Sequence, residues 1–241
     1  MTDERNEIAI STLLEHLARY RLTEFSVLKR LPVFADWRPR DLRRLLRDGE
    51  RQRLIGSAPL HQAARYWFLE RDGASRVGLP EQFSGPLSEV AKMRASAVLR
   101  YCCHSAPMRH RLTAEELKQH FPTLHRPGMP SHYYFDPQGA GTIGLLRIDA
   151  GQRGRWDRSI QTLRQDISSH VLCDGFRQLA LTGRFRITLV TVHPRKANRL
   201  SEALKQHRDV QRIPVEVMAM PELLPLVVPC HRKEVTKLRR Y

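Results

Sequence analysis

Apolar residues recur at helical spacing over the first fifty residues and predict three helices. The first is expected over residues 7–20, where four apolar side chains fall on one face: Ile10, Leu13, Leu14 and Leu17. A second, short helix is expected to begin at Thr23 as the N-cap and to run to Lys29. A third is expected from about residue 40, with its leucines on one side and Gly49 placed to end it.

A two-stranded hairpin is expected after the third helix. Residues 52–56 predict one strand, 56–59 a turn, and the aromatic run 65–69 a second strand. Three helices followed by a hairpin is the order of a winged helix-turn-helix domain, in which the third helix reads DNA. We therefore expect such a domain over residues 1–79.

The pattern changes after residue 80. Residues 80–128 predict a helical connector, in which Thr113 and Glu116 form a capping box, and which could bridge two domains or mediate a homodimer. Apolar strands then alternate with amphipathic helices over residues 129–229, which predicts an α/β domain and an α+β fold for the whole chain. Residues 230–241 form a basic tail.

Charge narrows the class of partner. The 241 residues hold 41 Lys and Arg against 25 Asp and Glu, a formal net charge of +16, which favours a polyanionic partner such as nucleic acid. The polar, acidic start does not resemble a signal peptide, and no apolar run is long enough to span a membrane. We expect a cytoplasmic, nucleoid-associated protein without a membrane partner.

The third predicted helix carries the strongest local signal. Arginines occupy one stripe about 100° wide, opposite Leu42, Leu45 and Leu46. The window 38–53 holds seven arginines and three acids, a surplus of 7 − 3 = +4, which is self-repelling unless an anion balances it. A solvated helix face is the simpler alternative. The DNA-binding interpretation predicts contacts from Arg38, Arg40, Arg43, Arg44, Arg47, Arg51, His61 and Arg65.

The second half resembles a known family in four short segments. They are PSHYYF at 130–135, LRIDAG at 146–151, FRITLVTV at 185–192 and RKANRL at 195–200. Their order is similar to that of the plasmid replication-relaxation family, and residues 7–70 resemble it more loosely. The resemblance implies an N-terminal winged helix, a C-terminal restriction-endonuclease-like domain, and a role in regulating transcription, or replication or transfer of a plasmid or integrated mobile element.

The chain departs from the family at the acidic positions. The family pattern has an Asp after the first proline of the hairpin and a Glu two residues before the Asp of the second strand, but here Ser131 and Arg147 stand beside Asp149. Carboxylates are the ligands that Mg²⁺ prefers, and Arg147 would repel the cation and pair with Asp149. We therefore expect a non-catalytic domain with no metal. The alternative is a Mg²⁺-dependent nuclease using Asp149 and Asp136.

Two other motifs do not predict a functional site. Gly139, Gly141 and Gly144 spell G-x-G-x-x-G, but the motif runs into an apolar strand rather than opening a helix, so it does not predict a dinucleotide site. Cys102 and Cys103 lie near several histidines without zinc-ligand spacing. We expect reduced thiols, no cofactor and no catalytic residue.

Overall fold

The computed structural model describes residues 2–61, 64–125, 132–138, 141–149, 156–207 and 212–227. The chain forms two compact units, Met1–His104 and Ser105–Tyr241. Both helices and strands are present, so the expected α+β class is confirmed. The segment expected to be a separate connector is divided between the units, because its first helix belongs to the first unit and its second helix to the other.

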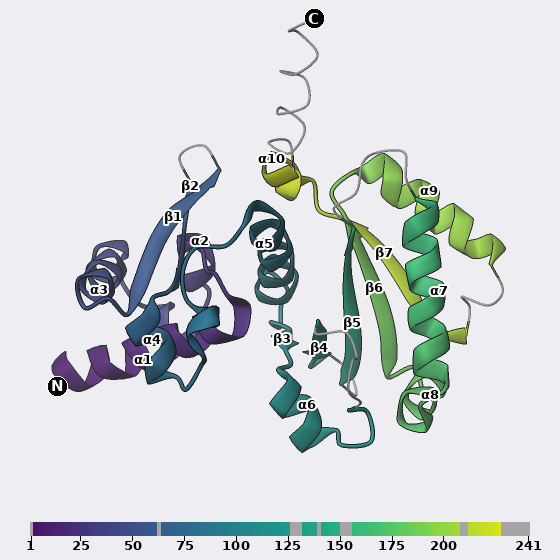
Figure 1. Ribbon diagram of the computed structural model, residues 1–241, viewed down its shortest axis with the longest axis horizontal. Helices are drawn as coiled ribbons and strands as arrows, with labels where there is room; N and C mark the ends of the chain where they lie inside the picture. Colours follow the sequence, from purple (N-terminus) through teal and green to yellow (C-terminus); the bar gives the residue numbers. More distant parts are fainter. Residues whose placement is uncertain are drawn as a thin grey trace, which may run out of the picture. The chain divides into compact units, whose positions relative to one another are not determined.

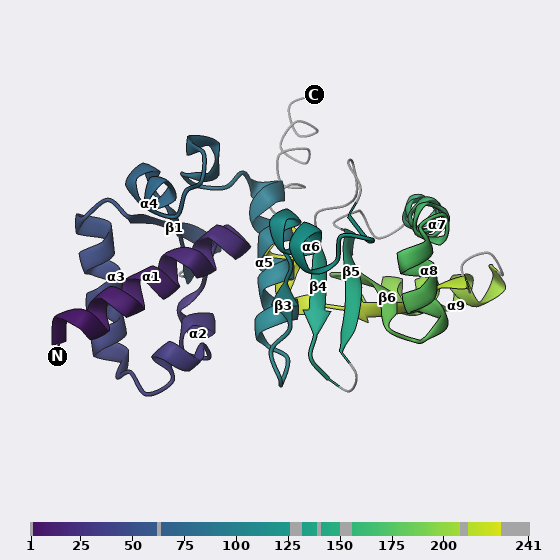
Figure 2. The ribbon, with the colours of Figure 1, turned by 90° about the horizontal axis from the view of Figure 1, so that it is seen from below.

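The first unit consists of helices around a small hairpin (Figure 1). Its elements are α1 (Thr2–Tyr20), α2 (Phe25–Leu28), η1 (Pro32–Phe34), α3 (Pro39–Arg51), β1 (Ile55–His61), β2 (Ala64–Leu69), α4 (Arg71–Arg76), η2 (Glu81–Phe83) and α5 (Glu89–Cys103). The predicted leucine faces of α1 and α3 are both buried in its core, and the two helices lie near each other in Figure 2.

Thr23 does not cap α2 as expected. The N-cap is Glu24, and Thr23 forms an isolated bridge with Trp67 of β2, with both backbone N–H···O distances at 3.0 Å. Its hydroxyl lies 3.0 Å from His16 Nε2. A strand partner from a distant segment therefore takes the place of a local cap.

The hairpin is longer than its sequence predicts. The expected turn at 56–59 lies inside β1, which pairs antiparallel with β2 from Ile55 opposite Leu69 to His61 opposite Ala64. Pro59 fits because a two-stranded hairpin has only edge strands, and the register shifts between Pro59 and His61. The turn residues 62–63 lie outside the described part of the chain.

Helix α5 closes the first unit. Ser88 caps it by accepting a hydrogen bond from the Ala91 amide. Arg100 in its last turn forms a bidentate ion pair with Glu24, Nε to Oε1 at 3.0 Å and Nη2 to Oε2 at 2.8 Å, and both side chains are largely buried. This pair ties α5 to the start of α2.

The described strands of the second unit form a five-stranded sheet in the order β3-β4-β5-β6-β7. They are β3 (His110–Arg111), β4 (Tyr133–Asp136), β5 (Thr142–Asp149), β6 (Phe185–Thr191) and β7 (Val215–Ala219). The pairs β3–β4 and β4–β5 are antiparallel, whereas β5–β6 and β6–β7 are parallel. The sequence did not predict β3, which has only two residues.

Helices of the second unit cover one face of this sheet. The unit contains α6 (Ala114–His120), α7 (Asp157–Val171), α8 (Asp174–Leu181), α9 (Pro194–Gln206), η4 (Pro221–Leu223) and α10 (Leu224–Val227). Ile143, Leu145, Ile187 and Leu189 share one core with apolar residues of α7, α8 and α9. The two parallel crossovers therefore put their helices on the same face (Figure 1).

In the second unit, the predicted capping box and the predicted strand that contains Gly144 are both present. The Thr113–Glu116 capping box is complete. Gly144 lies inside β5, where an added Cβ would approach the Tyr134 ring to 2.0 Å, so a packing requirement explains this glycine. Gly139 and Ser131 lie outside the described residues. Among the described helices, none combines the length and apolar character needed to cross a bilayer.

Candidate nucleic-acid interface

Helix α3 separates its apolar and cationic residues cleanly. Leu42, Leu45 and Leu46 are buried, at 0%, 7% and 2% exposure. Pro39 occupies the first turn, where its missing N–H costs nothing, and Asp41 complements the helix dipole. The helix is thus anchored by its leucines and turns its other face outward.

Gly49 does not end the helix. It is buried within the last turns, where an added Cβ would lie 3.1 Å from the Ile55 side chain. The chain leaves the helix through Gln52 and then Arg53, which has a positive φ of 56°. Gly49 is therefore explained by the close approach of β1, and the expectation that it stops the helix is wrong.

The predicted arginine row is exposed along the whole of α3. Arg38, Arg40, Arg43, Arg44, Arg47 and Arg51 all have exposed side chains. Arg40 and Arg51 lie 3.7 and 3.3 Å from Asp41 and Asp48 in solvent-exposed pairs, which contribute little to stability. Within the described part of the chain, the side chains of Arg38, Arg44 and Arg47 have no ion-pair or hydrogen-bond partner.

An aromatic ring supports one member of the row. The Arg43 guanidinium lies over the Phe25 ring, 5.0 Å from its centroid. A cation over an aromatic face is stabilised while its hydrogen-bond donors remain available. Phe25, at the start of α2, therefore restricts Arg43 without neutralising it.

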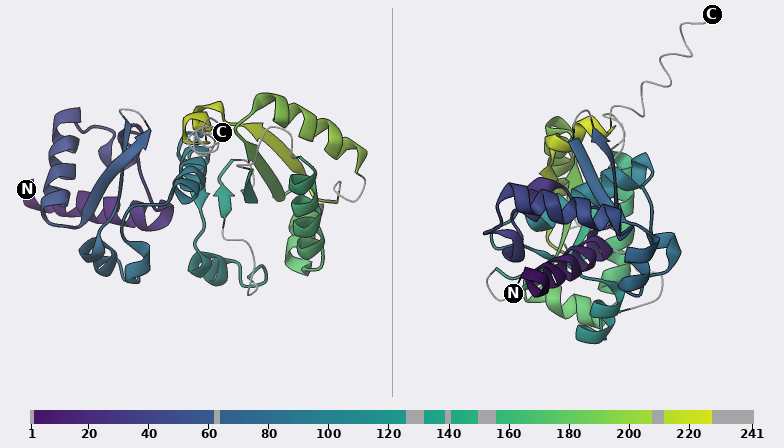
Figure 3. Two further views of the ribbon diagram at one scale, coloured as in Figure 1. Left: turned by 45° about the horizontal axis from the view of Figure 1, so that its top comes forward. Right: turned by 90° about the vertical axis from the view of Figure 1, so that its left-hand side faces the viewer.

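The hairpin lies beside α3, as Figures 1 and 3 show. Trp67 Nε1 of β2 donates to Glu50 Oε1 of α3 at 3.2 Å, and the Leu54 amide donates to the Gly49 carbonyl at 3.0 Å. These bonds hold the hairpin against the C-terminal end of the helix. The sequence did not predict the pairing of Trp67 with Glu50, because nothing near either residue in the chain indicates its partner.

Both predicted hairpin contacts lie near the end where β1 leads into β2. Arg65 is exposed and donates from Nη2 to Ser57 Oγ at 2.8 Å on the neighbouring strand. His61 is the last residue of β1 and is partly buried, and its Nδ1 has no hydrogen-bond partner in the described residues. The hairpin thus presents one fixed cation and one imidazole on the same unit as the arginine row.

The two carboxylates of the nuclease alternative lie at opposite ends of β5. Asp136 pairs with Thr142, and Asp149 follows Thr142 by 149 − 142 = 7 residues. At about 3.3 Å per residue this is about 23 Å along the strand. A single metal ion cannot bridge that distance, so Asp136 and Asp149 do not form one site.

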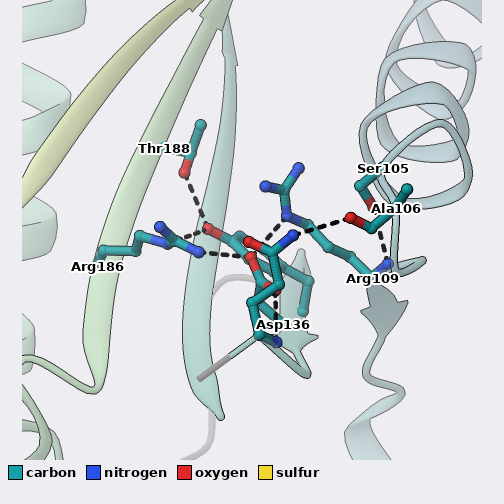
Figure 4. Close-up of polar contacts among 8 residues, drawn as sticks. Ser105, Ala106, Arg109, Asp136, Arg186 and Thr188 are labelled. Carbon is teal, nitrogen blue, oxygen red and sulfur yellow. Dashed lines mark hydrogen bonds and ion pairs between the residues drawn. The ribbon is translucent and has the colours of Figure 1, made fainter. Parts of the chain in front are cut away.

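Asp136 already has two cationic partners. It is 1% exposed and lies between Arg109 Nε at 2.9 Å and Arg186 Nη2 at 2.5 Å (Figure 4). Burial alone would raise the pKa of Asp136, but Arg109, the Gln138 amide and Arg186 outweigh it and hold the pKa below its ordinary value. The carboxylate is therefore charged and committed to a structural network.

Asp149 does not pair with Arg147 as expected. Arg147 instead forms a bidentate ion pair with Asp166 of α7, because α7 crosses the face on which Arg147 lies. Asp149 Oδ2 accepts hydrogen bonds from Lys196 Nζ at 2.8 Å and Ser159 Oγ at 2.6 Å. Lys196 was missed, although it shares the helical spacing of Leu200 and Leu204 and so belongs to the buried face.

Histidine and cysteine side chains do not assemble a metal site in the described part of the chain, where no group of three potential ligands lies together. His170 is buried, with Nε2 2.7 Å from the Tyr133 hydroxyl, and burial lowers its pKa. Cys102, Cys103 and Cys173 are buried free thiols, and burial raises the pKa of Cys103 to about 11. These groups belong to the packed interior of each unit.

Comparison of the chain with protein-family models, with curated proteins and with solved structures finds no match.

Proposed function

We propose that this protein binds double-stranded DNA and that the first unit acts as a winged helix-turn-helix domain. The proposal rests chiefly on the exposed arginine row of α3, whose opposite face is anchored by buried leucines. Uncompensated cations at fixed positions cost stability, and phosphates or guanine edges would offset that cost. The formal net charge of +16 supports the same class of partner.

The dimensions of α3 suit the major groove of B-DNA. Its 13 residues extend about 20 Å at about 1.5 Å per residue. The groove is about 12 Å wide and accepts a helix with its side chains. In this proposal, Arg44 and Arg47 contact base edges and nearby phosphates in the groove. Arg38 and Arg40, at the start of the helix, contact only the phosphate backbone of the DNA.

The hairpin supplies flanking contacts. Arg65 is held by Ser57 at a position from which it can reach a neighbouring phosphate, and His61 lies at the same end of the hairpin. Contacts of this kind fix the register of a protein on the duplex without reading its sequence. The wing is thus expected to raise affinity more than specificity.

The cellular role that fits this binding is regulation. We infer control of transcription, or of replication or transfer of a plasmid or integrated mobile element, because the sequence segments described above resemble the replication-relaxation family. A homodimer would place two copies of α3 on half-sites one helical turn, about 34 Å, apart.

Fluorescence anisotropy with a labelled random-sequence duplex tests the proposal. The double variant Arg44→Glu/Arg47→Glu should lose most duplex affinity at moderate salt. The matched control Arg71→Glu/Arg94→Glu changes the charge equally on exposed residues of the same unit outside α3 and should bind nearly as the parent does. Equal binding by the α3 variant and the control would reject the assignment of α3.

A further inference from the structure

The second unit carries a cationic surface that its own fold does not explain. Helix α9 has no acidic residue in its first turn and begins Pro194-Arg195-Lys196. The N-terminal end of a helix has a partial positive charge, so cations are unfavourable there. The two cations at this end of α9 therefore lower the stability of the helix.

Among the described residues, one of these two cations has an ion-pair partner and the other has none. Lys196 is 2% exposed and pairs with Asp149. Arg195 is exposed, as is Arg199 one turn later on the same side of α9. Neither guanidinium has an ion-pair or hydrogen-bond partner among the described residues.

A third arginine, Arg158, lies in the first turn of α7, which Asp149 connects to the first turn of α9. Asp149 Oδ2 accepts from Lys196 of α9 and from Ser159 of α7, so the first turns of the two helices meet above the end of β5. Arg158, directly before Ser159, is exposed and has no side-chain partner in the described part of the chain. Figures 1 and 3 show α7 and α9 on the same side of the sheet.

The net charge of this surface is positive. We define the α7–α9 surface by its exposed side chains Arg158, Arg195 and Arg199, with the neutral Gln161 and Asn198 beside them. Asp157 is the exposed acid of the same turns, and Glu202 is occupied by Lys205 at 2.8 Å. Three cations against one remaining acid leave 3 − 1 = +2.

We propose that the α7–α9 surface binds the phosphate backbone of the same duplex that the first unit engages. Guanidiniums bind phosphate oxygens in a bidentate manner, and neutral amides add hydrogen bonds that carry no sequence information. A lipid surface fits less well, because membrane-bound helices also present apolar side chains, and those defining this surface are all polar.

This inference rests on the proposed function and adds a second point of contact to it. Two linked sites on one polyanion strengthen binding through their effective concentration, without a change in either site alone. The second unit would therefore contribute to affinity for any sequence, whereas α3 would provide selectivity.

Duplex binding by the full chain over a salt series tests the inference. The variant Arg195→Glu/Arg199→Glu should bind roughly tenfold more weakly at about 0.1 M salt, with a salt slope shallower by about 2, since each phosphate contact contributes about 0.9 to the slope. The variant Arg195→Gln/Arg199→Gln, which removes the two charges without reversing them, should show a smaller loss of duplex affinity. The matched control is Lys118→Glu/Arg212→Glu, which reverses two exposed cations of the second unit away from this surface.

The outcomes separate the inference from the proposed function. If the α9 variant binds like its control while Arg44→Glu/Arg47→Glu loses binding, the inference is wrong and the proposed function stands. If the α9 variant loses binding while the α3 variant does not, the α7–α9 surface is the DNA site and the assignment of α3 is wrong. Unchanged binding by both variants would reject both.

Discussion

At the scale of residues, neighbouring positions of α3 have separate roles, one in the packed core and one on the exposed surface. Leu46 is 2% exposed in the core of the first unit, and Arg47 beside it is exposed with no side-chain partner in the described residues. Stability and binding should therefore respond to different substitutions only one position apart.

Leu46→Ala should lower the free energy of unfolding by about 2–5 kcal/mol, because it removes buried methyl groups and leaves a cavity. Arg47→Gln should change it by no more than about 0.5 kcal/mol and should weaken duplex binding instead. Urea unfolding and anisotropy on both variants check this. A large stability loss in Arg47→Gln would mean that the arginine has a structural role.

His16 should make the first unit sensitive to acid. Burial, with a smaller effect of Arg19, lowers the pKa of His16 from 6.5 to about 3. The unfolded chain therefore takes up a proton that the folded chain excludes, and stability falls as the pH drops from about 6.5 towards 3. Between pH 7 and pH 5 this histidine should cost about 2 kcal/mol.

The variant His16→Gln isolates this effect, because glutamine keeps a polar contact to Thr23 but does not titrate. Urea unfolding at pH 7 and pH 5 should show that the variant loses about 2 kcal/mol less than the parent on acidification. Equal losses would show that His16 is protonated in the folded state.

At the scale of elements, the second unit depends on one buried ion pair at the end of β5. Asp149 and Lys196 are 9% and 2% exposed, and Ser159 donates to the same carboxylate oxygen. Removing either charge breaks this ion pair and leaves the other charge in a low-dielectric environment, which costs more than the pair itself contributes.

A double-mutant cycle tests this arrangement. Lys196→Met should lower the free energy of unfolding by about 3–5 kcal/mol, and adding Asp149→Asn should recover part of that loss, because the side chain that lost Lys196 is then uncharged. Additive losses in the double variant would show that the two residues do not interact.

The sequence predicted elements wherever the determining contacts were local. The α3 leucine period and the Thr113–Glu116 capping box are properties of neighbouring residues, and both are confirmed. Thr23 and Gly49 were misinterpreted because their roles depend on Trp67 and Ile55, which approach from other segments. The partners of Asp149 were missed because the crossover helices alone bring them there.

At the scale of the whole molecule, the excess charge is distributed over both units. The arginine row of α3 and the α7–α9 surface are separate cationic surfaces, and both are built on helices whose opposite faces are buried. The carboxylates of Asp136, Asp149 and Asp166 are instead held in internal ion pairs. These two exposed cationic surfaces support the proposed binding of a polyanion.

The most direct test of the central claim is photo-crosslinking of the full chain to a random-sequence duplex containing 5-bromodeoxyuridine, followed by mass spectrometry of the crosslinked peptides. We predict crosslinks in α3 and in the β1–β2 hairpin, lost in Arg44→Glu/Arg47→Glu and kept in Arg71→Glu/Arg94→Glu. Crosslinks confined to residues outside 38–69, or an unchanged pattern in the α3 variant, would contradict the claim that α3 contacts DNA.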